Sequence, residues 1–250
     1  MKIGYRVAFK EEVGAHRADL VQISYWKRFG PTLKQVEETA ARCRELDVPY
    51  VIHPVFTPLS ETRPEYRKQN LEELTRLARL TDLGLIVHDE TMAGGERLTG
   101  EQLIQYEETL AYLRTLCPVS LENATNTLDI DWFWNQLTGA ITIDLGHFEA
   151  SGIDSVERMV SFPEDLLSRV DYVHMHRNNG KHGDGSITDH WPLTESCPEV
   201  EALKALLHRK KDLSVILEVN ELDQMGKSLS ILSQLGIRLD ERGIRSDIQS

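Results

Sequence analysis

Imidazole and carboxylate side chains recur in this chain at the ends of short apolar runs. An apolar run of about four residues that ends on His, Asp or Glu is typical of a buried strand that delivers one polar side chain. Imidazole nitrogens and carboxylate oxygens gathered in one place are the ligands that a divalent metal ion needs. The residues with this placement are His53, His88, Glu122, Asp144, His147, His174 and Glu218.

Four of these residues form the predicted metal site, namely Glu122, Asp144, His174 and Glu218. Three carboxylates and one imidazole suit a hard or borderline cation such as Mn²⁺, Zn²⁺, Co²⁺ or Mg²⁺. Without a metal, three carboxylates brought together would repel one another, and at least one would take up a proton. We therefore expect a divalent metal cofactor, with one to three ions per chain.

The other three histidines can extend this site. His147 follows Asp144 by three residues, so both can face one cavity, and His147 could ligate a second ion or contact substrate. His53 and His88 could hold a second ion with Glu122 as the bridging residue. They could instead bind substrate or orient a ligand, since a single histidine at a strand end often does.

The segment after His174 carries further candidates. Side chains alternate along a strand, so we expect His176 to face outward if His174 faces inward, unless the strand has ended. The loop that follows contains no clear Asp-x-His pair, and His190 is its best candidate metal ligand. Arg177 and Lys181 could meet an anionic group of the substrate.

The size and composition favour one soluble enzyme domain. The chain of 250 residues is long enough for one large domain, which we predict over 1–250. No stretch approaches the roughly 18 consecutive apolar residues of a membrane span. Cys43, Cys117 and Cys197 form no CxxC pair and suggest a reducing compartment, so we expect a cytoplasmic protein. The net charge of −12 makes nucleic acid an unfavoured partner, although a local basic strip could survive it.

Strand-like and helical segments alternate along the chain. Eight strands that alternate with helices require parallel neighbours, and eight is the number that closes a (β/α)8 barrel of the TIM type at about this length. The predicted strands lie near residues 2–9, 20–24, 50–55, 84–88, 118–122, 140–144, 170–176 and 213–219. The predicted helices include Leu33–Leu46, Tyr66–Leu80, Leu103–Leu116, Val156–Val170 and Val200–Leu207.

Local signals refine this division. Thr99 could cap a helix, with Gln102 at the capping-box position three residues later. The segment 125–138 contains three consecutive aromatic residues and predicts a short or irregular helix. In such barrels the working residues come from the carboxyl ends of the strands, and the candidate ligands all fall there.

Taken in order, these motifs resemble the xylose-isomerase-like TIM-barrel superfamily, which includes the AP-endonuclease family 2 enzymes and many sugar isomerases and epimerases. The resemblance covers almost the whole chain. The motifs that carry it are Ile52-His53-Pro54, Val87-His88, Leu121-Glu122-Asn123, Ile143-Asp144-Leu145-Gly146-His147, Val173-His174-Met175-His176 and Leu217-Glu218-Val219.

The resemblance implies one of two activities. In the isomerase and epimerase branch, residues matching the four predicted ligands hold one metal, and Glu122 and Glu218 act as proton-transfer groups. In the endonuclease branch, three zinc ions also recruit residues matching His53, His88 and His147 together with an Asp-x-His pair.

We predict an isomerase or epimerase of a small sugar, sugar phosphate or keto acid, with Glu122, Glu218 and His147 as catalytic residues. Its partner would be a small carbohydrate-like substrate, and an oligomer is compatible with the sequence. The alternative is a zinc-dependent phosphodiesterase of the AP-endonuclease type. No GxSxG, Walker A or GxGxxG motif supports other chemistry.

Overall fold

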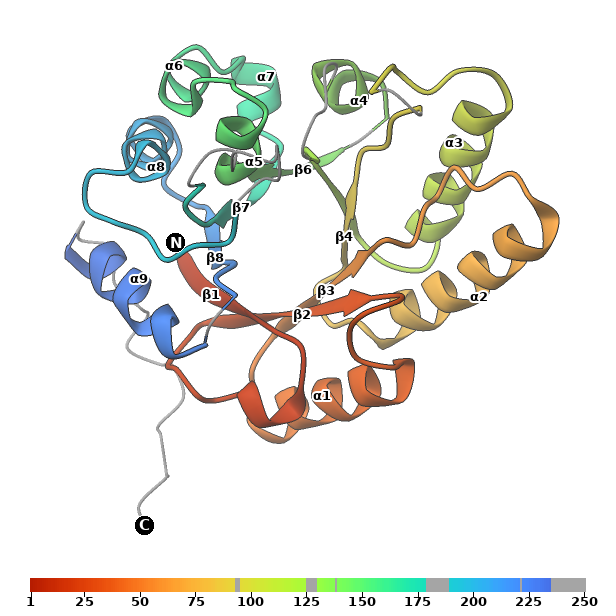
Figure 1. The fold of residues 1–250 in the computed structure, drawn as a ribbon, viewed down its shortest axis with the longest axis horizontal. Helices are drawn as coiled ribbons and strands as arrows, with labels where there is room; N and C mark the ends of the chain where they lie inside the picture. The colour runs from red at the N-terminus through yellow and green to blue at the C-terminus, as the bar shows by residue number, and fades with distance from the viewer. Residues whose placement is uncertain (93–94, 125–129, 138, 179–188, 221, 235–250) are drawn as a thin grey trace, which may run out of the picture.

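The eight apolar runs form eight parallel strands that close into one barrel. In this computed structural model each strand pairs with its neighbours along the chain, and β1 pairs with β8 to close the ring (Figure 1). The predicted single-domain (β/α)8 fold is confirmed, while the domain bounds 1–250 stay a prediction. The strands are β1 (Lys2–Val7), β2 (Leu20–Trp26), β3 (Tyr50–Val55), β4 (Leu85–His88), β5 (Val119–Glu122), β6 (Ala140–Asp144), β7 (Val170–Met175) and β8 (Ser214–Leu217).

Helices surround the barrel and connect successive strands (Figure 1). The structure describes residues 1–92, 95–124, 130–137, 139–178, 189–220 and 222–234. Its helices are α1 (Leu33–Glu45), α2 (Pro64–Leu80), α3 (Gly100–Arg114), α4 (Ile130–Leu137), α5 (Leu145–Ala150), α6 (Ser155–Val160), α7 (Glu164–Leu167), α8 (Pro198–Arg209) and α9 (Leu222–Gln234), with a short 3₁₀ turn at Lys10–Glu12. In this part of the chain, no helix is both long and apolar enough to cross a membrane.

The helices follow the usual rules of amphipathic packing. In α1 the residues Val36, Ala40 and Cys43 recur at helical spacing and are buried against the barrel. The helix starts with a capping box in which Thr32 accepts from the backbone of Gln35 and the Gln35 side chain accepts from the backbone of Thr32.

Two local predictions are wrong. Thr99 does precede α3, but its side chain forms no capping hydrogen bond. The single helix expected over Val156–Val170 is instead the two short helices α6 and α7, because Pro163 lacks the N–H group that a continuous helix would need there. The expected short helix in 125–138 is α4, and residues 125–129 and 138 lie outside the described residues.

Below the polar residues at the carboxyl ends of the strands, the barrel interior is mainly apolar, and the hydroxyl groups of Ser120 and Thr142 in the same layer hydrogen-bond to each other at 2.7 Å. Side chains two residues apart on a strand face the same side, so Ile86 lies below His88 and Ile216 below Glu218. The apolar layer is a buried cluster of Leu20, Val51, Ile86 and Ile216. It forms the floor under the polar residues.

Candidate metal centre

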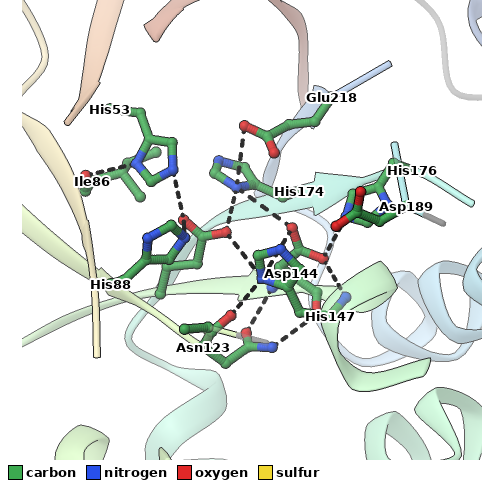
Figure 2. A network of polar contacts seen from close by, with 12 residues as sticks. His53, Ile86, His88, Asn123, Asp144, His147, His174, His176, Asp189 and Glu218 are labelled. Atoms are coloured by element: carbon green, nitrogen blue, oxygen red, sulfur yellow. Dashed lines mark hydrogen bonds and ion pairs between the residues drawn. The ribbon is translucent and has the colours of Figure 1, made fainter. Parts of the chain in front are cut away.

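Neighbouring strands bring the predicted ligands to the carboxyl end of the barrel. His88 ends β4, Glu122 ends β5 and Asp144 ends β6. The strand register sets His88 beside Glu122, and Asp144 beside His174 of β7. Figure 2 shows the side chains of His88, Asp144 and His174 converging from these strands and that of Glu218 from the end of β8.

Three carboxylates surround one nitrogen atom of His174. Its Nδ1 lies 2.8 Å from Oε1 of Glu122, 3.8 Å from Oε1 of Glu218 and 3.9 Å from Oδ2 of Asp144. All four side chains are buried. The structure therefore assembles the four residues in which the sequence predicts the first metal site.

Two histidines lie against the other oxygen of Glu122. Nε2 of His53 and Nε2 of His88 are each 3.5 Å from Oε2 of Glu122. Nδ1 of His53 lies 2.8 Å from the carbonyl oxygen of Ile86, so it must donate and carry the proton. The lone pair of His53 is then on Nε2, which faces Glu122.

A third group consists of His147, His176 and His190. Nδ1 of His147 donates to the carbonyl of Asn123 at 2.8 Å, and Nδ1 of His190 donates to the carbonyl of Glu218 at 2.9 Å. Both rings therefore keep their lone pairs on Nε2. The candidate ligand atoms lie within 4.8 Å of one another in this group, and likewise in the groups His53, His88 and Glu122, and Glu122, Asp144 and His174.

His176 is buried and faces the centre. Strand β7 ends at Met175, so the alternation that would have turned His176 outward does not apply. Its Nδ1 accepts the backbone N–H of His190 at 3.0 Å, and its Nε2 lies 3.2 Å from Oδ1 of Asp144. His176 links the loop after β7 to the carboxylate that ends β6.

Asp144 is held by its backbone as well as its side chain. Its N–H donates to Oδ1 of Asn123 at 2.7 Å, and its carbonyl accepts from Nδ2 of Asn123 at 2.9 Å. Oδ1 of Asp144 also accepts the N–H of His147 at 2.7 Å and so caps α5 (Figure 2). The sequence analysis missed this role of Asn123, although the residue directly follows Glu122.

The protonation states follow from burial and from the neighbouring charges. Burial opposes the charged form of His174, but the carboxylates of Glu122 and Glu218 outweigh it and raise the pKa of His174 to about 9. Burial also opposes the ionisation of Glu122, yet the surrounding histidines, His174 first, hold its pKa well below the usual range. Burial lowers the pKa of His53 to about 4 despite the nearby Glu122, so His53 is neutral at pH 7.

Several buried polar atoms in this centre lack a hydrogen-bond partner among the described residues. They include Oε2 of Glu122, Oδ2 of Asp144 and Nε2 of His88. Each unpaired buried group costs roughly 1–3 kcal/mol. These atoms are oxygen and nitrogen ligands of the type that divalent ions select, and a cation would satisfy them together. The residues present fit a divalent metal ion.

A cavity of about 360 Å³ opens above the centre. His53, His88 and Glu218 line its floor, and Arg6 and Trp26 line its wall. Arg6 was not among the predicted site residues. The same search for polar residues at strand ends, applied to the first strand, would have found it, since Arg6 is the penultimate residue of β1.

The two cations predicted to meet substrate are placed differently. Arg177 forms an antiparallel bridge with Trp191, with backbone hydrogen bonds of 2.9 and 3.1 Å. It is not among the described residues that line the 360 Å³ cavity. Lys181 lies outside the described residues. Substrate binding by either residue stays a prediction.

Comparison with solved structures shows the same fold in proteins of different activities. A D-tagatose 3-epimerase-like protein is 21% identical, with a TM-score of 0.70 over 95% of this chain and 98% of that chain. Endonuclease IV from Thermus thermophilus is 18% identical, with a TM-score of 0.64 over 95% of this chain and 100% of that chain. D-allulose 3-epimerase from Methylomonas sp., in complex with D-allulose, is 12% identical, with a TM-score of 0.64 over 94% and 96%.

At these identities the similarity shows the fold and leaves the reaction open. No curated protein matches the sequence. The family described as "Xylose isomerase-like TIM barrel" matches residues 24–235, which is most of the chain and includes every residue of the three groups of candidate metal ligands. This protein belongs to the xylose isomerase-like TIM-barrel family.

Proposed function

We propose that this protein is a divalent-metal-dependent isomerase or epimerase of a small sugar, sugar phosphate or keto acid. The observation that carries the proposal is the placement of Glu122 and Glu218 around Nδ1 of His174, at the base of a cavity of about 360 Å³. That volume lies in the range of roughly 300–1,000 Å³ that is usual for small-molecule sites.

In this proposal, Glu122, Asp144, His174 and Glu218 hold the first ion. His53 and His88 hold a second ion with Glu122 or orient the substrate. When bound, the metal supplies a Lewis acid that polarises the oxygen atoms of the substrate.

The two glutamates carry the proton transfer. Glu218 borders the cavity, where its carboxylate can take a proton from a substrate carbon. Gln22 donates a hydrogen bond to Oε1 of Glu218 and so fixes the orientation of that carboxylate. Glu122 lies deeper, is fully buried and is not among the described residues that line the cavity; in this proposal it is the second proton-transfer group. His147 also borders the cavity, and with Nδ1 bound to Asn123 it presents Nε2 to a substrate hydroxyl.

The similar solved structures support this choice without deciding it. Two of the three named above are a D-tagatose 3-epimerase-like protein and a D-allulose 3-epimerase. The second of these is in complex with D-allulose, a small sugar.

A specific observation favours a second candidate, a zinc-dependent phosphodiesterase of the AP-endonuclease type. The histidine-containing groups could hold up to three ions, and the fold is also that of endonuclease IV. The net charge of −12 weighs against a polymeric phosphodiester substrate.

The proposal is tested by proton exchange. The metal-loaded protein is incubated in D₂O with ketoses, ketose phosphates and keto acids, and deuterium at the carbon next to the carbonyl is measured. We expect exchange with at least one substrate, and Glu218→Gln should lower exchange and metal content together. Glu73→Gln is the control, because Glu73 pairs with Lys27 at 3.0 Å on the outer helix α2. Cleavage of abasic-site DNA without any such exchange would replace this proposal with the second candidate.

A further inference from the structure

Arg6 is a buried cation in the wall of the 360 Å³ cavity. Its side chain is only 8% exposed, and its guanidinium lies 5.4 Å from the centre of the Trp26 ring. Nη2 donates to Oδ1 of Asn220 at 2.7 Å. The aromatic ring and the amide fix the plane of the guanidinium, which is a rigid fork of donors.

The other terminal nitrogen of Arg6, Nη1, has no good acceptor in the described part of the chain. Its nearest carboxylate oxygen is Oε2 of Glu218 at 3.6 Å, which is too long for a hydrogen bond. Nδ1 of His190 lies 3.4 Å away, but that atom carries the proton donated to the Glu218 carbonyl. Two donors cannot bond to each other, so the N–H groups of Nη1 need an acceptor from outside.

Asn220 offers a second donor at the same place. Arginine has no acceptor, so the atom of the Asn220 amide that faces Arg6 must be the oxygen. The amide nitrogen Nδ2 is then turned away from Arg6 and can donate to another group. Asn220 also lines the cavity.

The charge of the cavity wall depends on the metal. Arg6 contributes one positive charge, while Glu218 and Asp189 contribute two negative charges. A divalent ion would be held by the carboxylates of Glu122 and Asp144 as well, and their two negative charges cancel the charge of the ion. With these included, one ion changes the sum of the site from −3 to −1. Metal binding therefore weakens the repulsion between these carboxylates and an anionic ligand, and Arg6 supplies the local attraction.

We propose that Arg6 and Asn220 form a subsite for an oxyanion group of the substrate, a phosphate or a carboxylate. The inference rests on the proposed function and names its substrate class, a sugar phosphate or sugar acid rather than a neutral sugar. Planar guanidinium groups recognise both anions through paired N–H donors. The anionic group lies against the wall between β1 and β8, while the reacting carbon lies over the glutamates.

Binding of two small anions tests the subsite without requiring turnover. Inorganic phosphate and glycolate are titrated separately into manganese-loaded protein by isothermal titration calorimetry. We expect the wild type to bind at least one of them, and Arg6→Met to weaken that binding by about tenfold or more, the loss expected for a charge-assisted hydrogen bond. Arg6→Lys should lose less, because it keeps the charge without the fork. Asn220→Leu should also weaken binding, and it leaves the contact between Arg6 and Glu218 in place.

The control for loss of a positive charge is Arg67→Met, since Arg67 is exposed on α2 and pairs with Glu108 at 3.1 Å. Metal content is measured for every variant.

Phosphate binding alone indicates a phosphorylated substrate, and glycolate binding alone indicates an acid. The inference is wrong if the wild type binds neither anion, or if Arg6→Met and Asn220→Leu bind like the wild type at equal metal content. Deuterium exchange with neutral ketoses and no anion binding would retain the proposed function and remove the subsite. Anion binding that depends on Arg6, without deuterium exchange on any substrate, would retain the subsite and remove the proposed function.

Discussion

Backbone carbonyls decide which nitrogen atom carries the proton in three histidines of this centre. His53, His147 and His190 all use Nδ1 to donate to a carbonyl oxygen, at 2.8, 2.8 and 2.9 Å. A second partner of this kind fixes the tautomer and the ring orientation of a metal-ligating histidine. These three residues therefore have Nε2 prepared for an ion or for substrate.

His176 differs from these three histidines, since its Nδ1 accepts a hydrogen bond and its Nε2 lies beside a carboxylate oxygen. Nδ1 accepts from the backbone of His190, so in the neutral ring Nε2 carries the proton and points to Asp144. We therefore predict that His176 positions Asp144 and does not ligate an ion. His176→Leu should lower metal affinity by about 10- to 100-fold, the usual effect of losing such a partner, and leave the number of ions bound at saturation unchanged.

Metal content at saturation and competition with a chelator dye measure the two quantities separately. His176→Gln, which keeps a donor, should recover part of the affinity. A drop of one ion per chain in His176→Leu at saturating metal would instead make His176 a ligand.

At the scale of the elements, the strand ends were predictable and the loops were not. A parallel barrel places every strand end at the same rim, so apolar runs ending in His88, Glu122 and Asp144 were enough to predict that these residues meet. The direction of the His176 side chain depended on the last residue of β7, and periodicity does not locate a strand end to within one residue. Arg6 also lies near a strand end, but it was missed because only His, Asp and Glu, the side chains that ligate metals, were sought there.

The first turn of α5 must leave room for His176. A Cβ atom on Gly146 would lie 2.2 Å from Cε1 of His176 and 2.5 Å from its Nδ1, far inside van der Waals contact. We predict that Gly146→Ala displaces the imidazole and lowers the free energy of unfolding by about 1–3 kcal/mol, the usual cost of overpacking. Metal affinity should fall with it, because Asp144 loses its neighbour.

Urea denaturation of wild type and variant, each at saturating and at zero metal, checks this. Gly139→Ala is the matched control, since a Cβ atom there would contact nothing within 4 Å. Equal stability of Gly146→Ala and Gly139→Ala would show that α5 yields without affecting His176.

At the scale of the whole molecule, closure of the barrel converts a pattern along the chain into one site. Residues as far apart in sequence as His53 and Glu218 meet because β1 pairs with β8 and completes the ring. The reaction was less predictable, since the same fold occurs in a D-tagatose 3-epimerase-like protein and in endonuclease IV. The shape of the cavity and the placement of Arg6 and Asn220 depend on contacts that no single motif encodes.

The centre also links the stability of the whole protein to pH and metal. In the metal-free protein, the proton on His174 lies among three carboxylates and has a pKa of about 9, against about 6.5 in an unfolded chain. The folded state binds this proton more tightly, so the proton stabilises the fold fully below pH 6.5, and this stabilisation is lost as the pH rises through 9. A shift of this size corresponds to at most about 3 kcal/mol.

A metal ion must displace that proton, so its binding should have the opposite pH dependence. Between pH 6.5 and 9 we predict that the melting temperature of chelator-treated protein falls while the stabilisation by saturating manganese increases. Differential scanning calorimetry measures the difference in melting temperature between the manganese-saturated and the chelator-treated protein. The titration of groups outside the centre affects both forms equally and cancels in this difference. Calorimetric titration at pH 7.5 in two buffers of different ionisation enthalpy should show release of about one proton for the first ion. If this difference stays constant between pH 6.5 and 9 and no proton is released, the ion does not replace the proton of His174 and the first metal site lies elsewhere.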